Sequence, residues 1–305
     1  MRDLLLLVFG DRQLRPFEHW LAYAAQRPLR GLSFLDALEK MALLVLAFFQ
    51  CVGLLLFDTP ITPYGDPIDR SGYELVFEDT FEGGVLDLEK WEYRGSGARA
   101  GGFMAPDQVR VEDGKLILRA EYRADGPGGA GWYSGIIRTK EEFIGGIFEV
   151  SAVVSEGGGF WSAFWLNAPG MASAEASNGG PGGAEIDIFE AGAYGKSFLT
   201  RNSVAFNVHV GGYGDGLRSA GPEAYYGKNI YKEYNTYTLK WTAEEYIFYI
   251  NGVEATRSSF QDGVSRAEEY IILSLELPDA EGFTEQPGFT AEFLVDCVRV
   301  WQEAD

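Results

Sequence analysis

The chain has 305 residues, of which 46% are hydrophobic and 23% charged, a composition that can bury a large core and excludes a wholly disordered or collagen-like chain. Its 45 acidic residues against 25 basic ones give a net charge of −20, which argues against a nucleic-acid partner because phosphate backbones are also negative. The two cysteines, Cys51 and Cys297, exclude a disulfide framework, and the two histidines, His19 and His209, exclude a His-rich metal site.

The first 57 residues form a separate part of the sequence, with a net charge of +1 against about −21 for the rest. Within them, residues 41–57 are apolar except for Gln50, and a helix of this length spans about 25 Å, slightly less than the ~30 Å hydrocarbon core of a membrane. Basic residues precede this run and acidic residues follow it, which places the N-terminus in the cytoplasm. We therefore predict a cytoplasmic segment at 1–40, a transmembrane signal-anchor helix at 41–57 and an extracytoplasmic remainder.

Two other interpretations of residues 41–57 stay open. A cleaved signal peptide would make the protein secreted, but about 40 residues precede the apolar run and no A-x-A cleavage site follows it. The second interpretation is that residues 41–57 form a helix buried in the core of the protein. Residues 58–72 contain Pro60, Pro63 and Pro67, which indicate an extended linker and therefore favour the anchor.

From residue 73 to residue 305 the sequence consists of short β-branched and aromatic runs separated by turn residues. Asp113-Gly114 and Asn251-Gly252 are typical of tight hairpin turns. About a dozen short strands within about 230 residues predict a single all-β sandwich of two antiparallel sheets. The predicted strands are Val109–Val111, Lys115–Glu121, Gly135–Thr139, Gly146–Val154, Phe160–Leu166, Glu185–Glu190, Val204–Val210, Thr236–Trp241, Tyr246–Ile250, Tyr270–Leu277 and Ala291–Trp301.

One predicted strand contains three acids in six residues: Glu185, Asp187 and Glu190. An ordinary core strand does not tolerate this pattern, because burying unpaired charge is costly. Side chains alternate along a strand, so Glu185 and Asp187 share a face while Glu190 points the other way. One extra residue at a β-bulge between Asp187 and Glu190 would bring all three acids to one face. A solvated polar face is the simpler alternative.

Two glutamates on one face suit retaining glycoside hydrolysis, in which two carboxyl groups about 5–5.5 Å apart act as nucleophile and acid/base. Asp187 lies between them and can hold a proton or a hydrogen bond that tunes the nucleophile. The negative charge of the nucleophile raises the pKa of Glu190, which keeps that residue protonated for the first step.

The sequence resembles glycoside hydrolase family 16, whose E-x-D-x-x-E signature matches Glu185-Ile-Asp187-Ile-Phe-Glu190. This spacing is typical of its laminarinase-like and algal-galactan-cleaving members. The resemblance covers most of Tyr73–Gln302. Its other motifs are Leu75–Phe81, Leu88–Trp91, Val111–Leu116, Ser134–Lys140, Phe143–Glu149, Phe160–Leu166 and Val295–Trp301.

The resemblance implies a jelly-roll β-sandwich of two curved antiparallel sheets, with a substrate cleft on the concave side. It implies that Glu185 is the nucleophile, Asp187 its helper and Glu190 the acid/base. For Trp161 and Trp165 the alternative to stacking on a sugar is packing in the core. For His209 the alternative is a core histidine whose hydrogen bonds are satisfied within the protein. The substrate-binding residues that the resemblance implies are Trp161, Trp165, Asn207 and His209.

The expected function is retaining endo-hydrolysis of a β-linked polysaccharide, β-1,3- or mixed β-1,3/1,4-glucan, by a membrane-anchored, extracytoplasmic monomer. The acidic body fits a neutral polysaccharide better than a sulfated one. No cofactor or catalytic metal is required, although the family implies a possible structural calcium ion near Asp296. An algal galactan hydrolase, a transglycosylase and a non-catalytic glucan-binding protein are the alternatives. Leu273–Leu277 replaces the Asn-containing run that is usual in laminarinases.

Overall fold

The computed structural model describes residues 60–172, 182–221, 224–259 and 263–304, together with Met41, Val45, Phe48, Phe49, Val52 and Gly53. The predicted cytoplasmic segment 1–40 lies outside the described residues, as does most of the predicted membrane helix 41–57. The six described positions of that helix are helical. Among the described residues, no helix is both long and apolar enough to span a membrane. The anchor stays a prediction.

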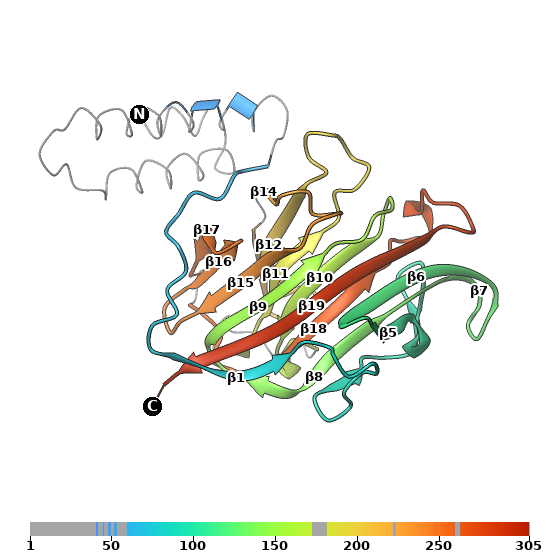
Figure 1. The fold of residues 1–305 in the computed structure, drawn as a ribbon, viewed down its shortest axis with the longest axis horizontal. Helices are drawn as coiled ribbons and strands as arrows, with labels where there is room; N and C mark the ends of the chain where they lie inside the picture. The colour runs from blue at the N-terminus through green and yellow to red at the C-terminus, as the bar shows by residue number, and fades with distance from the viewer. Residues whose placement is uncertain are drawn as a thin grey trace, which may run out of the picture.

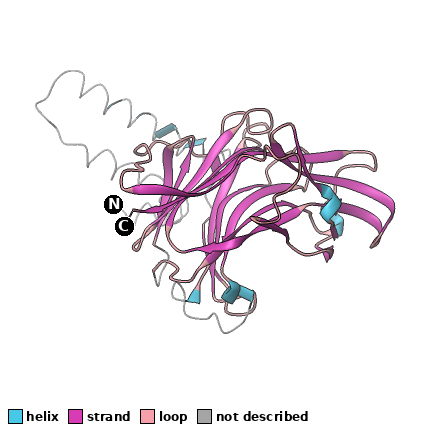
Figure 2. Cartoon of the chain, turned by 60° about the horizontal axis from the view of Figure 1, so that its bottom comes forward, coloured by secondary structure: helices cyan, strands magenta, loops and turns pink. Residues whose placement is uncertain are grey.

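The described residues after Pro60 form two mostly antiparallel sheets that pack face to face (Figures 1 and 2). We call the first the back sheet; its described part has the strand order β17-β16-β15-β9-β19-β6-β7-β4-β3, with β1 beside β19 and β5 beside β6. The long strand β19 crosses its centre. The bounds are β1 (Tyr73–Asp79), β3 (Gly97–Arg99), β4 (Gly102–Met104), β5 (Val109–Glu112), β6 (Lys115–Gly126), β7 (Gly129–Ser134), β9 (Gly146–Val153), β15 (Asn235–Trp241), β16 (Tyr246–Ile250), β17 (Val253–Ser258) and β19 (Thr290–Glu303).

The second sheet, which we call the site sheet, has the order β13-β12-β11-β10-β18-β8-β2 in its described part, with β14 beside β12. In the described residues, the short 3-10 helices η1 (Pro106–Gln108), η2 (Pro169–Ala172) and η4 (Ala280–Gly282) lie in connections. The strand bounds are β2 (Trp91–Tyr93), β8 (Ile136–Phe143), β10 (Trp161–Asn167), β11 (Glu185–Ala191), β12 (Ser203–Val210), β13 (Arg218–Ala220), β14 (Ala224–Tyr226) and β18 (Glu269–Glu276). The predicted all-β sandwich of two sheets is therefore confirmed.

The core lies between the two sheets and is rich in aromatic side chains. On β11 of the site sheet, the fully buried Phe189 points toward the back sheet, where its ring centroid lies 4.1 Å from Tyr237 and 5.9 Å from Phe293. Burying a side chain of this size contributes about 2–3 kcal/mol. This contact fixes which face of β11 is internal, and therefore which face is left for the acids.

Both predicted hairpin turns are confirmed. Asp113 and Gly114 join β5 to β6 with φ values of 52° and 68°, and Asn251 and Gly252 join β16 to β17 with φ values of 51° and 75°. Positive φ at both central residues defines the type I′ turn, whose twist matches that of the flanking strands.

The predicted strand Gly135–Thr139 starts at a residue that lies outside any strand. Gly135 is the single residue between β7 in the back sheet and β8 in the site sheet, so the chain changes sheets there. A Cβ atom on Gly135 would lie 2.7 Å from the backbone oxygen of Gln108. The position requires glycine because of this close approach.

The predicted linker 58–72 does not extend freely away from the sandwich; from Pro60, where its description begins, it packs against it. Ile61 is only 2% exposed and belongs to the core; it forms a β-bridge with Tyr225, and its backbone N–H donates to the carbonyl of Ala224 at 2.8 Å. Pro67 forms a second bridge, with Val253. The expectation of an extended tether was wrong here, because an apolar residue between two prolines found an open sheet edge to pair with.

Candidate active site

The backbone of β11 is irregular at the acids. Asp187 pairs with Asn207 on β12 and Glu190 pairs with Ala205, so three steps along β11 match two steps along β12. The pairing of β11 with β10 is irregular at the same place. One extra residue on one strand is the definition of a β-bulge, and the predicted bulge is confirmed.

The bulge places all three acids on the outer face of the site sheet. Glu185, Asp187 and Glu190 line one cleft with a volume of about 380 Å³, while Phe189 faces the core. The alternative of a simple solvated face does not hold, because Asp187 is only 4% exposed. The other residues that line the cleft are Arg94, Arg99, Trp161, Ala163, Trp165, Tyr213 and Glu276.

Glu185 is held by two hydrogen bonds to the same carboxylate oxygen. Nδ2 of the buried Asn167, which lies opposite it on β10, donates to Oε2 at 3.0 Å, and the hydroxyl group of Tyr213 donates to the same oxygen. Burial, and then the charge of Glu185, raises the pKa of Tyr213, so its hydroxyl group stays protonated and acts as a donor. These bonds fix the orientation of the carboxylate.

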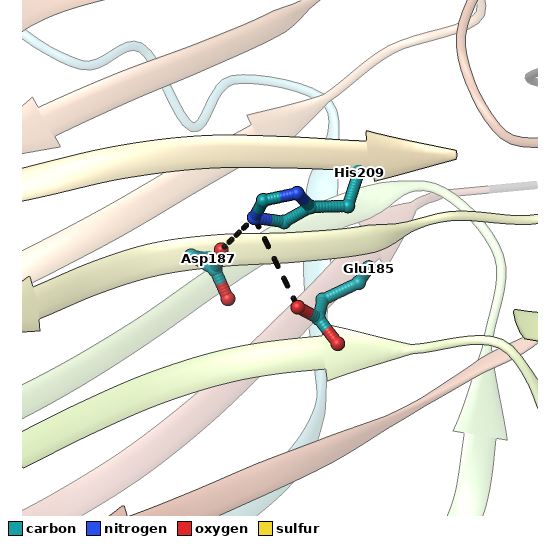
Figure 3. Close-up of side chains that lie close together, drawn as sticks. All are labelled: Glu185, Asp187 and His209. Atoms are coloured by element: carbon teal, nitrogen blue, oxygen red, sulfur yellow. Dashed lines mark ion pairs between the residues drawn. The ribbon is translucent and has the colours of Figure 1, made fainter. Parts of the chain in front are cut away.

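Asp187 and Glu185 both lie beside the imidazole ring of His209, as Figure 3 shows, and Asp187 stands between Glu185 and Glu190 along β11. Nε2 of His209 lies 3.2 Å from Oδ2 of Asp187 and 4.0 Å from Oε1 of Glu185, and its Nδ1 lies 2.6 Å from Oγ of Ser219. Burial raises the pKa of Asp187 well above its ordinary value, and the charges of Glu190 and Glu185 raise it further. The upward direction favours the protonated form of Asp187, whose carboxyl group lies within hydrogen-bond distance of Nε2.

Glu190 lies at the other side of Asp187 and accepts a hydrogen bond of 2.8 Å from Nδ2 of Asn207. Burial raises the pKa of Glu190; the hydrogen bond from Asn207 and the charge of His209 lower it, and the charge of Glu185 raises it. The net direction is upward, which favours the protonated acid. The two glutamates are thus in different environments, as acid and nucleophile require.

The two predicted stacking residues, Trp161 and Trp165, both line the cleft. Trp165 is only 6% exposed, its Nε1 donates to Oγ of Ser274 at 3.0 Å, and the Cζ atom of Arg94 lies 4.7 Å from its ring centroid. Packing, the alternative to stacking, therefore accounts for Trp165. Trp161 is partly exposed and remains the candidate for sugar stacking.

Reasoning from sequence missed five residues of the site: Asn167, Arg94, Arg99, Tyr213 and Glu276. A signal existed for Glu276, since it is an acid within the apolar run Leu273–Leu277, the same pattern that singled out β11. Its carboxylate accepts two hydrogen bonds from Arg99, at 2.8 and 2.9 Å. Asn167, Arg94, Arg99 and Tyr213 carried no such pattern.

Glu185, Asp187 and His209 also form a group that a metal ion could bind, since one potential ligand atom of each lies within 4.8 Å of the others. Asn167 and Tyr213 bind the other carboxylate oxygen of Glu185, Oε2, and Ser219 lies at the other ring nitrogen of His209, so Oε1, Oδ2 and Nε2 are the atoms that face one another. Asp296, the suggested calcium ligand, lies exposed on β19 and is outside any such group of acids and histidines in the described part of the chain. The calcium site stays a prediction.

The sequence matches known proteins over most of the sandwich. A family model described as "Glycosyl hydrolases family 16" matches residues 99–270, more than half of the chain. The glucan endo-1,3-beta-glucosidase A1 of Niallia circulans is 25% identical over 279 residues, which cover 78% of this chain and 39% of that protein. The keratan-sulfate endo-1,4-beta-galactosidase of Sphingobacterium multivorum is 28% identical over 193 residues, which cover 60% of this chain and 43% of that protein.

The chain thus spans less than half the length of these two curated relatives. Among solved structures, the endo-β-1,3-glucanase of Pyrococcus furiosus superimposes with a TM-score of 0.62 at 19% sequence identity, covering 79% of this chain and 100% of that one. At this level of identity the likeness shows a shared fold.

Proposed function

The chain belongs to glycosyl hydrolases family 16, and from this we propose that it is a retaining endo-glycosidase that cuts β-1,3- or mixed β-1,3/1,4-glucan. The observation that carries the proposal is the bulge in β11, which brings Glu185, Asp187 and Glu190 into one cleft. The relative named as a glucan endo-1,3-beta-glucosidase supports the choice of glucan.

In the first step a sugar chain lies in the cleft with its scissile bond between the two glutamates. The Glu185 carboxylate attacks the anomeric carbon, the bond from that carbon to the glycosidic oxygen breaks, and the protonated Glu190 gives its proton to the departing oxygen. The product is a glycosyl ester on Glu185. Asn167 and Tyr213 hold the attacking carboxylate in place during this step.

In the second step Glu190, now ionised, takes a proton from water. The oxygen of that water attacks the anomeric carbon, the ester bond to Glu185 breaks, and the starting configuration is restored. The upward direction of the Glu190 pKa suits both of its roles, since an acid that titrates closer to neutrality can give and then recover a proton. Burial raises the pKa of Asp187 well above its ordinary value, so its neutral form is favoured, and a neutral Asp187 adds no further negative charge beside the nucleophile.

Product analysis against laminarin, lichenan, agarose, carrageenan and xyloglucan tests the proposal, with Glu185→Gln as the inactive control. We expect short oligosaccharides from laminarin or lichenan with the unaltered protein and none with the variant. Cleavage of agarose or carrageenan alone would show that the substrate is a galactan and not a glucan. Longer products from an added acceptor would indicate transglycosylation, and absence of products from every polysaccharide would indicate a binding protein.

We also propose that residues 41–57 anchor the enzyme in a membrane with the sandwich outside. The described positions of this segment support it: Met41, Val45, Phe48 and Phe49 are helical and between 48% and 65% exposed, an apolar surface that lipid would cover. A protease added to intact cells should degrade the sandwich, with a cytoplasmic protein as the protected control. Protection of residues 58–305 in intact cells would contradict this topology.

A further inference from the structure

A second cavity, which we call the side pocket, adjoins the cleft. Residues 94–99, Met104 and Ile136 line it, and its volume is about 250 Å³. Arg94 and Arg99 line both cavities, so they form the boundary between them. A substituent on a sugar in the cleft would have room here.

The side pocket differs from the cleft in charge. The cleft is lined by four acids, whereas none of the residues that line the side pocket is acidic. Gly95 and Gly97, with φ values of 77° and 121°, have open space where a Cβ atom would project, so no side chain fills the pocket at these positions. The side pocket is a small space whose charged groups are both arginines.

The two arginines are not equivalent. Arg99 is neutralised by the paired hydrogen bonds of its guanidinium group to Glu276. The guanidinium group of Arg94 lies over two rings, with Cζ 4.7 Å from the centroid of Trp165 and 5.9 Å from that of Tyr270. Among the described residues no carboxylate lies within 4.0 Å of its nitrogen atoms. Stacking uses the faces of the guanidinium plane and leaves the N–H groups at its edge available to a ligand.

A neighbouring arginine shows that an arginine can stack on a ring and still be paired with a carboxylate. Cζ of Arg138 lies 4.7 Å from the ring centroid of Tyr270, yet its guanidinium group is paired with Glu92. Arg94 therefore differs from Arg99 and Arg138, since of these three it alone is stacked on aromatic rings with no carboxylate partner among the described residues. An arginine held rigid at a cavity, with donors unused, is suited to bidentate binding of an oxyanion.

We propose that the side pocket binds an anionic substituent, a sulfate ester or a carboxylate, on a sugar bound in the cleft, with Arg94 as the recognising residue. The inference rests on the proposed function, which it deepens by naming the substrate class as a β-linked polysaccharide that carries such groups. It also revises the expectation of a neutral substrate, which was drawn from the net charge of −20 and not from the cleft.

The test uses the full chain with Glu185→Gln, so that ligands bind without turnover. Calorimetry compares laminaripentaose with the same oligosaccharide sulfated at C6 in one arm and oxidised at C6 to a carboxylate in the other. We expect an anionic ligand to bind more tightly than the neutral one, and Arg94→Gln to reduce that preference by about tenfold or more. The arm that shows the preference identifies the anion.

Arg138→Gln is the matched control, because it removes an equal charge that stacks on the same tyrosine but is already paired. It should leave the preference unchanged. Two outcomes would overturn the proposed role of the side pocket and leave the proposed function standing. One is binding of the neutral ligand with no preference for either anion, and the other is a preference that Arg94→Gln does not alter. Binding of none of the three ligands would overturn both.

Discussion

Nδ2 of Asn207 lies 2.8 Å from Oε2 of Glu190 and donates a hydrogen bond to it, although in the sheet Asn207 pairs with Asp187. The bulge in β11 makes this contact possible, because it turns the later glutamate back to the face that Asn207 shares. The amide stabilises the ionised form of Glu190 and so opposes the effect of burial on its pKa.

We predict that Asn207→Ala shifts the alkaline limb of the pH profile to higher pH. Loss of the hydrogen bond removes an effect that lowers the pKa of Glu190, so the acid stays protonated further into the alkaline range. The measurement is kcat/KM against pH. Asn167→Ala is the matched control, since the same amide on the other neighbouring strand contacts Glu185 and should leave the alkaline limb in place. An unmoved or lowered limb in Asn207→Ala would contradict the assignment of Glu190.

The bulge itself predicts the outcome of two deletions. Without Ile188, regular alternation would put Asp187 outward, Phe189 inward and Glu190 outward, so the acids would still share one face. We expect this deletion variant to fold and to keep measurable activity. Deleting Ile186 instead makes Glu185 and Asp187 adjacent, which places them on opposite faces, and should lower activity by at least about a hundredfold. Circular dichroism and reducing-end release measure both, and equal activities would contradict the geometry.

These acids show what could be predicted from sequence and why. Three carboxyl groups in an apolar strand are costly unless they share a solvent-accessible face, so the pattern predicted a bulge between Asp187 and Glu190, with a solvated polar face as the alternative. The two I′ turns were equally determined by local sequence. In each case the physical constraint lies within a few residues of the chain.

Features that depend on distant segments could not be predicted. Tyr213 reaches Glu185 from the connection after β12, and Arg94 covers Trp165 from the connection after β2. Ile61 is buried because its bridge partner, Tyr225, happens to lie at an open edge. None of these contacts has a local pattern, since each is set by which strands adjoin in the finished sheets.

Glu269 predicts how stability depends on pH. This residue of β18 is fully buried, and burial raises its pKa from 4.5 to about 8, although hydrogen bonds from Ser265 and the Ala184 backbone lower it. Between those values the folded state holds a proton that the unfolded state has lost, so stability falls as pH rises from about 4.5 to about 8. The loss is on the order of 4 kcal/mol over the full range.

Glu269→Gln should make this slope less steep while keeping the acceptor for the Ala184 N–H group. The remaining slope comes from Asp187 and Glu190, whose pKa values burial also raises. Urea unfolding at pH 5 and pH 8 measures the difference in unfolding free energy between the two conditions. The exposed Glu74→Gln is the control and should leave the slope as it is in the unaltered protein. A slope in Glu269→Gln that is as steep as in the unaltered protein would show that other groups cause it.

Glu190→Ala tests the acid/base role. The aryl group of an activated aryl β-glycoside leaves without needing a proton. The first step should therefore survive in this variant, while the second step becomes slow. Added azide needs no general base, and should restore turnover and give the β-glycosyl azide. Glu276→Ala, which removes another acid of the same cleft, should show no azide rescue. If azide has no effect on Glu190→Ala, its assignment is wrong.

The most direct test of the whole account is to identify the residue that becomes covalently linked to the sugar. A 2-deoxy-2-fluoro-β-laminaribiosyl fluoride slows both steps and traps the ester, and mass spectrometry of the digested protein locates it. The account predicts that the label lies on Glu185, at the outer face of β11. A label on Glu190 or Asp187 would contradict it.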